Sequence, residues 1–376
     1  MIDNETRAVR AGEEIDGEKL SAFLRREEFG HGGDLSIEQF PAGSSNLTYL
    51  LKIGDDEFVL RRPPFGNTVR SAHDMRREFE VLSRLSAVYR QAPKPLLYCE
   101  NESVIGSQFY LMERRCGLII RGDTAAQRVS SPTVREGAVG PSSPSDALDR
   151  LRTDQDYRLQ VCRTFITNLA DLHALDYKAA GLQDLGRPEG YCKRQVEGWT
   201  TRYQNAKTHE HPELESAIRW LDQNIPPESA AALVHNDYKF DNVMLDRGDL
   251  TQIVAVLDWE MVTVGDPLMD LGTTLGYWVG PEGGEAMLEM PFNPRVLRET
   301  VTRRDLVEMY AGASGRDVSN ILYYYVFGLF KIAGIAQQIY ARYAKGFTKD
   351  ERFARFDQFV SGLGRLAAAA IEKGRI

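Results

Sequence analysis

The residues best suited to catalysis lie in the segment HNDYKFDN at 235–242, which combines Asp237, Lys239 and Asn242 in one short loop. Asp258 follows 16 residues after Asn242, at the end of an aliphatic run. Transfer of a phosphoryl group to an alcohol requires oxygen ligands for Mg²⁺, a carboxylate beside the acceptor hydroxyl and a cation near the phosphate. We expect Asn242 and Asp258 to bind the metal. We expect Asp237 to orient the hydroxyl and receive its proton, and Lys239 to neutralise charge on the transferred group.

Each of these residues, taken alone, is also an ordinary loop residue. Asp237 and Asn242 are typical turn residues, and Asp258 is a typical helix cap. Their spacing, combined with the flanking strand-like runs, favours the catalytic interpretation. His235 stands at the end of an apolar run, so we predict a buried residue that organises the loop by hydrogen bonding rather than an acid or base.

A second group of polar residues lies in the N-terminal part of the chain. Ser44, Ser45 and Asn46 fall between two predicted strands, where a turn of small residues can bring backbone N–H groups close to phosphate oxygens. A plain hairpin turn is the alternative. Arg61 ends the next predicted strand and Glu78 lies within the next predicted helix. This placement predicts an ion pair that holds the cation against the α- and β-phosphates of a nucleotide.

The hydrophobic periodicity predicts an antiparallel sheet with one inserted helix to position this N-terminal group. A first amphipathic helix is predicted over 17–28, with Asp16 as its cap, and the inserted helix over 72–88. The expected strands are 35–40, 48–53, 58–61, 96–98 and 108–113.

After residue 149 the periodicity is mostly helical, with predicted helices at 157–175, 193–204 and 321–343. Three short aliphatic runs interrupt this part and flank the catalytic segment; they are 232–235, 243–245 and 253–257, and we predict strands there. The stretch of about 122–146 is rich in Ser, Pro and Gly and is predicted to be a flexible loop.

The composition is that of an ordinary globular protein. The 376 residues include 46 Lys and Arg against 54 Asp and Glu, a net charge of −8, and 43% are hydrophobic. This excludes a disordered or fibrous chain, and it argues against a nucleic-acid partner because proteins that bind phosphate backbones concentrate Lys and Arg. The length allows about two to three domains or one large two-lobed enzyme.

The cysteines and the apolar segments indicate the cell compartment. Neither zinc-pair spacing nor a disulfide framework is present, so we predict reduced thiols at Cys99, Cys116, Cys162 and Cys192. From the polar N-terminus we expect no signal peptide or membrane anchor. The apolar run 321–330, followed at once by Lys331, is about half as long as a bilayer requires. We therefore predict a cytoplasmic protein with no membrane partner.

Several motifs resemble those of the kinase-like phosphotransferase superfamily, in its aminoglycoside and choline phosphotransferase branch. HNDYKFDN resembles H-x-D-x-x-x-x-N, and LDWE followed by Gly-Asp-Pro at 265–267 and by Asp270 resembles D-x-E…G-D-P-x-x-D-L. The resemblance is greatest to the kinase-like domains fused to, or encoded beside, acyl-CoA dehydrogenases. The segments that carry it are GSSNLTYLL, FVLRRPP, FYLMER, GRPEGYCKRQVEGW and IYARY, and they span 43–343.

The resemblance implies an α+β, two-lobed protein-kinase-like fold. Its small antiparallel-sheet lobe would cover 1–115, with the hinge near 112–116, and its larger, mostly helical lobe would cover 117–376. ATP would bind in the cleft, with Glu113 at the hinge. Asp270 would match an aspartate that braces the catalytic loop, and Glu260 an acidic position near a second metal.

The same resemblance gives further expectations for the site residues. Asp237 matches the catalytic aspartate of the superfamily, and Asn242 and Asp258 match its magnesium ligands. Arg61 and Glu78 match the pair that anchors the phosphates. The sequence departs from the family where Arg61 replaces a lysine found in many kinases, and where Asn236 and Lys239 stand in place of Gly and Arg. Arginine remains charged and binds phosphate, so nucleotide binding is expected to survive.

The function expected from these features is an ATP- and Mg²⁺-dependent transfer of the γ-phosphate to a hydroxyl of a small molecule. Hydroxyacyl compounds or hydroxyacyl-CoAs are the first candidates, with aminoglycosides, choline-like amines and sugars as the others. A catalytically inactive, nucleotide-binding regulatory module is the alternative. A metal-dependent hydrolase is disfavoured because His209 and His211 are two positions apart rather than four. Aromatic candidates for the acceptor pocket, or else for a buried core, are Tyr191, Trp199, Tyr203 and Tyr323–Tyr325.

Overall fold

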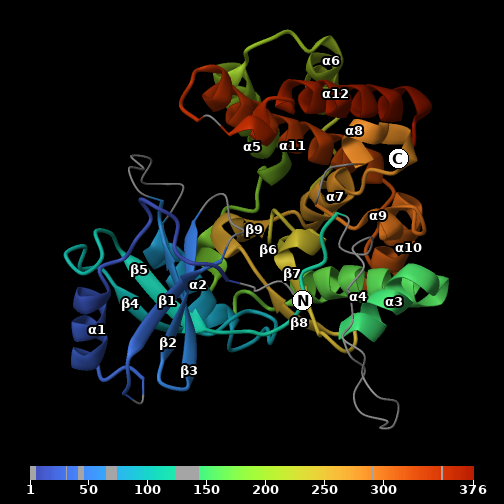
Figure 1. Cartoon of the computed structure of the whole chain (residues 1–376). Coiled ribbons are helices and arrows are strands. Elements are labelled where there is room, and N and C mark those ends of the chain that lie inside the picture. Colours follow the sequence, from blue (N-terminus) through green and yellow to red (C-terminus); the bar gives the residue numbers. More distant parts are fainter. Residues whose placement is uncertain are drawn as a thin grey trace. The chain divides into compact units, whose positions relative to one another are not determined.

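A computed structural model of the chain describes residues 6–30, 32–40, 46–64, 74–122, 144–288, 292–348 and 350–376 (Figure 1). These residues divide into two compact units. The first contains the described residues up to Cys116 together with Val254–Glu260. The second contains 117–122, 144–253 and Met261–Ile376.

A five-stranded antiparallel sheet forms the centre of the first unit, with the strand order β1-β2-β3-β5-β4. The strands are β1 (Leu35–Gln39), β2 (Leu47–Ile53), β3 (Asp56–Arg62), β4 (Pro95–Cys99) and β5 (Phe109–Glu113). The register places Arg61 of β3 opposite Thr48 on one side and opposite Tyr110 on the other. Arg61 therefore lies on a central strand of the sheet.

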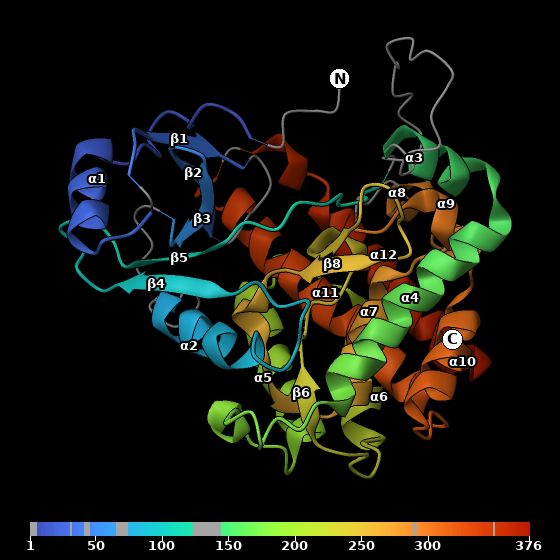
Figure 2. The same cartoon turned by 90° about the horizontal axis from the view of Figure 1, so that it is seen from below.

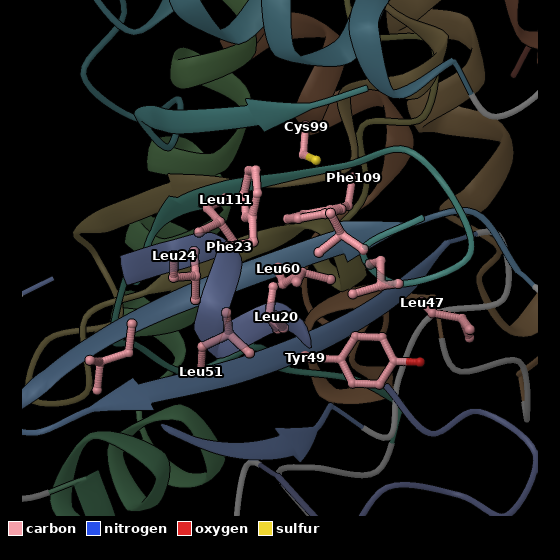
Figure 3. Packing of buried hydrophobic residues seen from close by; sticks show 13 residues of the cluster. Leu20, Phe23, Leu24, Leu47, Tyr49, Leu51, Leu60, Cys99, Phe109 and Leu111 are labelled. Atoms are coloured by element: carbon pink, nitrogen blue, oxygen red, sulfur yellow. The ribbon is translucent and has the colours of Figure 1, made fainter. Parts of the chain in front are cut away.

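Helix α1 (Gly17–Arg26) covers one face of this sheet. The Asp16 side chain accepts a hydrogen bond from the Lys19 amide at 3.0 Å, which caps the helix as the sequence predicts. Figure 3 shows the α1 side chains among those of the strands. The buried cluster includes Leu20, Phe23 and Leu24 of α1 with Leu51, Leu60 and Leu111 of the sheet.

Helix α2 (Met75–Leu85) packs against the other face. Successive side chains of a strand point to opposite faces, so Arg61 and Tyr110 are directed away from the α1 cluster. The Phe79 ring of α2 contacts the Tyr98 and Tyr110 rings, with centroids 5.6 and 6.2 Å away. This packing brings the buried Glu78 of α2 to Arg61.

The second unit is mostly helical, and the apolar helix α11 runs through its core. Figures 1 and 2 show α11 beside α7 and α12, against both of which it packs. The helices are α3 (Pro144–Thr153), α4 (Gln155–Ala174), α5 (Tyr191–Ala206), α6 (Pro212–Gln223), α7 (Pro267–Tyr277), α8 (Glu285–Leu288), α9 (Arg295–Arg298), α10 (Arg303–Ser314), α11 (Ile321–Ala344) and α12 (Phe356–Lys373). Within the described ranges, no helix has the length and apolar character needed to span a bilayer.

Glycines allow α7 and α11 to approach each other closely. A Cβ added to Gly328 of α11 would lie 2.0 Å from the Gly272 carbonyl oxygen, and a Cβ added to Gly272 of α7 would lie 2.1 Å from the Tyr324 carbonyl oxygen. Any larger side chain would push the two backbones apart. The closeness matters because both helices send side chains to the catalytic segment.

Short strands hold the catalytic segment. Strand β6 (Ala232–Val234) pairs antiparallel with β9 (Thr263–Gly265), and β7 (Val243–Leu245) pairs with β8 (Ile253–Val256). The loop between β6 and β7 closes in a 3₁₀ turn, η2 (Phe240–Asn242). The predicted strands around this segment are confirmed.

The predicted α+β class is confirmed, and the structure corrects some boundaries. The first helix ends at Arg26 rather than 28, because Glu28 takes a positive φ of 52° that a right-handed helix does not allow. The loop expected over 122–146 falls largely outside the described residues. Its last residues are wrongly assigned, since α3 begins at Pro144, and proline is well tolerated in the first turn of a helix.

Candidate active site

The loop that carries Asp237 is fixed by Asp270, near the start of α7. The Asp270 carboxylate accepts hydrogen bonds from the backbone amides of His235, at 2.6 Å, and Asn236, at 2.8 Å. His173 Nε2 lies 3.2 Å from the same carboxylate. The structure thus shows Asp270 bracing the loop, as the resemblance implied. Burial alone would raise the pKa of Asp270, but the hydrogen bond and charge of His173 outweigh burial and hold this pKa below its usual value.

His235 is a fully buried organiser of the loop, as predicted. Its Nδ1 accepts a hydrogen bond from the Asp237 amide at 3.2 Å, and its side chain has 0% exposure. The next residue, Asn236, takes a left-handed φ of 69°. This sharp turn of the backbone is one that asparagine tolerates better than most residues.

Both oxygens of the Asp237 carboxylate are engaged. Tyr277, the last residue of α7, donates its hydroxyl to Oδ1 at 2.7 Å. Asn242 Nδ2 donates to Oδ2 at 2.9 Å, and the Lys239 ammonium group pairs with the same oxygen. Burial would raise the pKa of Asp237, but the Lys239 charge and the hydrogen bonds from Lys239 and Tyr277 lower it below its ordinary value. The carboxylate is therefore ionised and held in one orientation at neutral pH.

The structure places Lys239 beside Asp237, and it also shows what surrounds the lysine. Its Nζ lies 5.0 Å from the centre of the Tyr277 ring and 6.0 Å from that of Phe292, within cation–π range. The Lys239 side chain is only 10% exposed to solvent. In this arrangement the charge of Lys239 stabilises the Asp237 carboxylate, and the predicted contact with a transferred phosphate stays a prediction.

Asn242 is oriented in a way that suits a metal ligand. Its Nδ2 donates to the Asp237 backbone carbonyl and to the Asp237 carboxylate, both at 2.9 Å. These two acceptors fix which end of the amide is nitrogen. Among the described residues, none donates a hydrogen bond to Asn242 Oδ1. Amide and carboxylate oxygens are the donors that Mg²⁺ prefers, so this oxygen fits the expected role.

The first unit carries the predicted ion pair. Arg61 Nη1 lies 3.2 Å from Glu78 Oε1, and the two side chains keep 11% and 3% of their exposure. Arg61 Nη2 also lies 3.3 Å from Asp258 Oδ1. Burial opposes the charge of Arg61, but the nearby Glu78 carboxylate, with smaller contributions that include Asp258, outweighs burial and raises the Arg61 pKa. Burial raises the pKa of Glu78, although Arg61 opposes this.

Asp258 lies two residues beyond the end of β8 and has a φ of 66°. Its carboxylate keeps 30% of its side-chain exposure. A partly exposed carboxylate oxygen is a suitable Mg²⁺ ligand. Because Asp258 belongs to the first unit and Asn242 to the second, the single metal site predicted from both stays a prediction.

The other residues predicted to bind the nucleotide are Ser44, Ser45, Asn46 and Glu113. Ser44 and Ser45 lie outside the described residues. Asn46 is buried, and its Nδ2 donates to Glu260 Oε2 at 3.3 Å. The Glu113 carboxylate accepts hydrogen bonds from the Lys94 amide and from Arg115 Nε, both at 2.8 Å, so this side chain holds the chain segments beside it in place. Contacts of these residues with a nucleotide stay predictions.

The aromatic residues considered for an acceptor pocket form part of the core. Every one of them is less than 9% exposed: Tyr191, Trp199, Tyr203, Tyr323, Tyr324 and Tyr325. The buried-core alternative is therefore confirmed. The four cysteines are free, as predicted.

Tyr277 was not identified from the sequence, because only the fold brings the end of α7 to the Asp237 carboxylate.

Comparison with known sequences supports the kinase-like interpretation. The sequence profile described as "APH: Phosphotransferase enzyme family" matches residues 36–135 and 142–299. Acyl-CoA dehydrogenase family member 11 of Gallus gallus is 31% identical over 370 residues, and that of Rattus norvegicus is 33% identical over 360. These alignments cover 96% and 93% of this chain but only 44% and 42% of the relatives. The chain thus spans less than half the length of these curated relatives.

Solved structures agree on the fold. A "putative aminoglycoside phosphotransferase" from Ralstonia eutropha has a TM-score of 0.72 and 28% identity, covering 96% of this chain and 99% of that one. A thermostable mutant of the aminoglycoside phosphotransferase APH(4)-Ia, in a ternary complex with AMP-PNP and hygromycin B, has a TM-score of 0.56 and 16% identity, covering 94% of this chain and 98% of that one. Choline kinase from Cryptosporidium parvum has a TM-score of 0.55 and 12% identity, covering 94% and 99%. The predicted kinase-like fold is confirmed.

Proposed function

We propose that this chain, which belongs to the phosphotransferase enzyme family, is an ATP- and Mg²⁺-dependent kinase that phosphorylates a hydroxyl of a small molecule. The observation that carries the proposal is the fixed Asp237 carboxylate. Asn242, Lys239 and Tyr277 hold it, and its pKa lies below the ordinary value. A regulatory module that only bound nucleotide would not need an ionised carboxylate oriented in this way.

Asp237 supplies the proton acceptor in this mechanism. Its carboxylate accepts a hydrogen bond from the acceptor hydroxyl and orients the oxygen toward the γ-phosphorus. As the new O–P bond forms and the bond to the β–γ bridging oxygen breaks, the hydroxyl proton passes to Asp237 and ADP leaves. Lys239 keeps Asp237 ionised before the transfer, because its positive charge favours the carboxylate form.

We assign residues to ATP and to Mg²⁺ by the charge and the ligand atoms of their side chains. We assign the phosphates of ATP to Arg61, which Glu78 and Asp258 hold in its charged form. We assign Mg²⁺ to Asn242 and Asp258, whose amide and carboxylate oxygens suit it. Bound magnesium would neutralise charge on the phosphates. The AMP-PNP complex of APH(4)-Ia supports the choice of an adenine nucleotide.

The acceptor is assigned by relatedness. The curated relatives are named as acyl-CoA dehydrogenase family members, so we propose a hydroxyacyl compound or hydroxyacyl-CoA as the first acceptor class. Aminoglycosides and choline-like amines form the second class, since structural relatives bear those names. We rank the hydroxyacyl class first because the relatives with acyl-CoA names are 31% and 33% identical to this chain, whereas the structural relatives that bear aminoglycoside or choline names are 28%, 16% and 12% identical.

The proposal can be tested by measuring ADP release. Purified protein is mixed with ATP, Mg²⁺ and a panel of hydroxyacyl-CoAs, aminoglycosides and choline. We expect acceptor-dependent turnover that Asp237→Asn lowers by at least about a thousandfold, while binding of AMP-PNP stays within about threefold. Asp241→Asn is the matched control, because Asp241 lies in the same segment but pairs with Arg121. Equal turnover in wild type and Asp237→Asn would refute the assignment. Nucleotide binding without turnover on any acceptor would favour the regulatory module.

A further inference from the structure

A buried lysine lies behind the catalytic loop. Lys331, in the middle of α11, is 1% exposed. Its Nζ donates to the backbone carbonyl of Asn236 at 2.6 Å and to Asn236 Oδ1 at 3.2 Å. Removing an ammonium group from water is unfavourable unless polar groups compensate for the loss of hydration. A lysine buried in the middle of this mostly apolar helix therefore requires polar groups that compensate its charge.

The partner of Lys331 is the residue just before Asp237, and other elements hold it as well. The Asn236 amide donates to Asp270, and its Nδ2 donates to the Met261 carbonyl at 3.1 Å. The Tyr191 hydroxyl lies 3.3 Å from the Asn236 side-chain amide. These contacts hold Asn236 at its left-handed φ of 69°. Lys331 alone among them contacts the Asn236 carbonyl oxygen.

We propose that Lys331 is a positioning residue for Asp237, acting through the Asn236 carbonyl. This carbonyl belongs to the planar peptide group that joins Asn236 to Asp237. A hydrogen bond to its oxygen fixes the plane of that peptide, and so it fixes the direction in which the Asp237 side chain leaves the backbone. The inference rests on the proposed function, in which Asp237 must meet an acceptor hydroxyl.

The charge of Lys331 makes this positioning dependent on pH. Burial lowers the pKa of Lys331 to about 8, and the nearby carboxylates oppose the shift. The charged groups that face Lys331 are Asp270 on α7, Asp237 and Lys239 in the loop and Arg202 on α5. Above about pH 8 the amine loses its charge, and a neutral amine donates a weaker hydrogen bond to the Asn236 carbonyl than an ammonium group does.

Lys331→Met tests the proposal, because methionine has a similar length but neither charge nor donor. We expect kcat to fall at least about tenfold while KM for ATP stays within about twofold, since the ATP contacts assigned above involve other residues. We also expect the wild-type kcat to decline between about pH 7 and 9, and the Met variant to show no such decline. The assay is ADP release from Mg²⁺–ATP, with water or any acceptor that supports turnover.

Gln337→Met is the matched control on the same helix. Gln337 is also fully buried, and its Nε2 donates to the Ala206 carbonyl at 2.9 Å, away from the catalytic loop. This variant loses a buried polar group of α11, so it should lose stability but keep the wild-type kcat and pH profile. A Gln337→Met enzyme with the same kinetic defect as Lys331→Met would show that the effect is merely structural, and it would overturn the proposal.

Lys331→Arg provides a second variant should Lys331→Met fail to fold. Arginine keeps its proton throughout this pH range, so the decline between about pH 7 and 9 should disappear while turnover at pH 7 is retained at least in part. An unchanged pH profile in Lys331→Arg, or an unchanged kcat in Lys331→Met, would overturn the proposal.

Hydrogen exchange separates this proposal from the proposed function, because it requires no turnover. The amides of His235 and Asn236 should exchange at least about tenfold faster in Lys331→Met than in wild type, since the loop has lost one of its fixed points. Faster exchange in a protein that phosphorylates nothing would support the positioning by Lys331 and leave only the proposed function refuted. Unchanged exchange would overturn the positioning itself.

Discussion

The Tyr277 hydroxyl donates a 2.7 Å hydrogen bond to Asp237 Oδ1, so the end of α7 contacts the oxygen of the carboxylate that neither Lys239 nor Asn242 engages. The Tyr277 ring also packs against Phe292, with centroids 4.9 Å apart. Helix α7 therefore contributes two residues that hold Asp237 in place. Asp270, near the start of the helix, holds the backbone of the loop, and Tyr277, at its end, holds the side chain.

Tyr277→Phe removes this hydrogen bond and keeps the ring. We expect kcat to fall about threefold to tenfold, which corresponds to the typical net value of about 1 kcal/mol for one hydrogen bond. The pKa of Asp237 should rise, because one of the groups that lowers it is gone. Steady-state kinetics from pH 4 to about 8 measures both effects. Tyr203→Phe is the control, since its buried hydroxyl has no partner in the described part of the chain; equal losses in the two variants would contradict the assignment.

Asp270→Asn should destabilise the second unit by about 2–3 kcal/mol at pH 7, because the carboxylate accepts two backbone hydrogen bonds that an amide cannot both accept. The pKa of Asp270 is lowered in the folded state, so its contribution is complete above about pH 4 and is lost as pH falls through the lowered value. The difference in unfolding free energy between wild type and variant should therefore shrink below about pH 4. Urea unfolding at pH 7 and pH 3.5 measures it, with the exposed Asp184→Asn as the control. A difference that grows toward low pH would contradict the prediction.

The sequence predicts well those features that neighbouring residues determine. The antiparallel sheet and α1 with its Asp16 cap follow from periodicity and local capping chemistry. The loop of Asp237 follows from a contiguous motif between strand-like runs. The ion pair of Arg61 and Glu78 was also predicted, because a strand end and the next helix place both side chains at one face of the sheet.

Contacts between distant segments were not predicted. Tyr277 lies 40 residues after Asp237 and Lys331 lies 95 residues after Asn236, and no local pattern joins these pairs. Lys331 did carry a signal, however. The helix predicted over 321–343 already contained it, and α11 does continue through Lys331 to Ala344. A single lysine inside an apolar helix indicates a buried polar partner, because the charge must be compensated.

Asp258→Asn should weaken the response to magnesium. The substitution replaces an anionic oxygen ligand by a neutral one, and asparagine tolerates the φ of 66° at this position, so the local backbone should persist. We expect the Mg²⁺ concentration for half-maximal ADP release to rise at least about tenfold, and chelation of Mg²⁺ to abolish turnover in wild type. Asp55→Asn, in an exposed turn of the first unit, is the control and should titrate as wild type. An unchanged magnesium titration in Asp258→Asn would remove Asp258 from the metal site.

Gly328→Ala should destabilise the second unit by about 2–3 kcal/mol or more, because the new Cβ would lie 2.0 Å from the Gly272 carbonyl oxygen and would force α11 away from α7. Gly312→Ala is the matched control. Gly312 lies inside α10, and beyond its own stretch of helix no atom of the described residues lies within 4 Å of a new Cβ, so alanine should stabilise the protein by about 0.5–1 kcal/mol through helix propensity. Denaturant unfolding of both variants measures the difference.

Gly328 also lies one turn before Lys331 on α11, so moving the helix should lengthen the contact between Lys331 and the Asn236 carbonyl. At temperatures where Gly328→Ala is still folded, we therefore expect a lower kcat with a nearly unchanged KM for ATP, as for Lys331→Met. Combining the two substitutions should lower kcat no further than Lys331→Met alone, because both act on one contact. Fully additive losses would show that the approach of α7 and α11 serves stability alone.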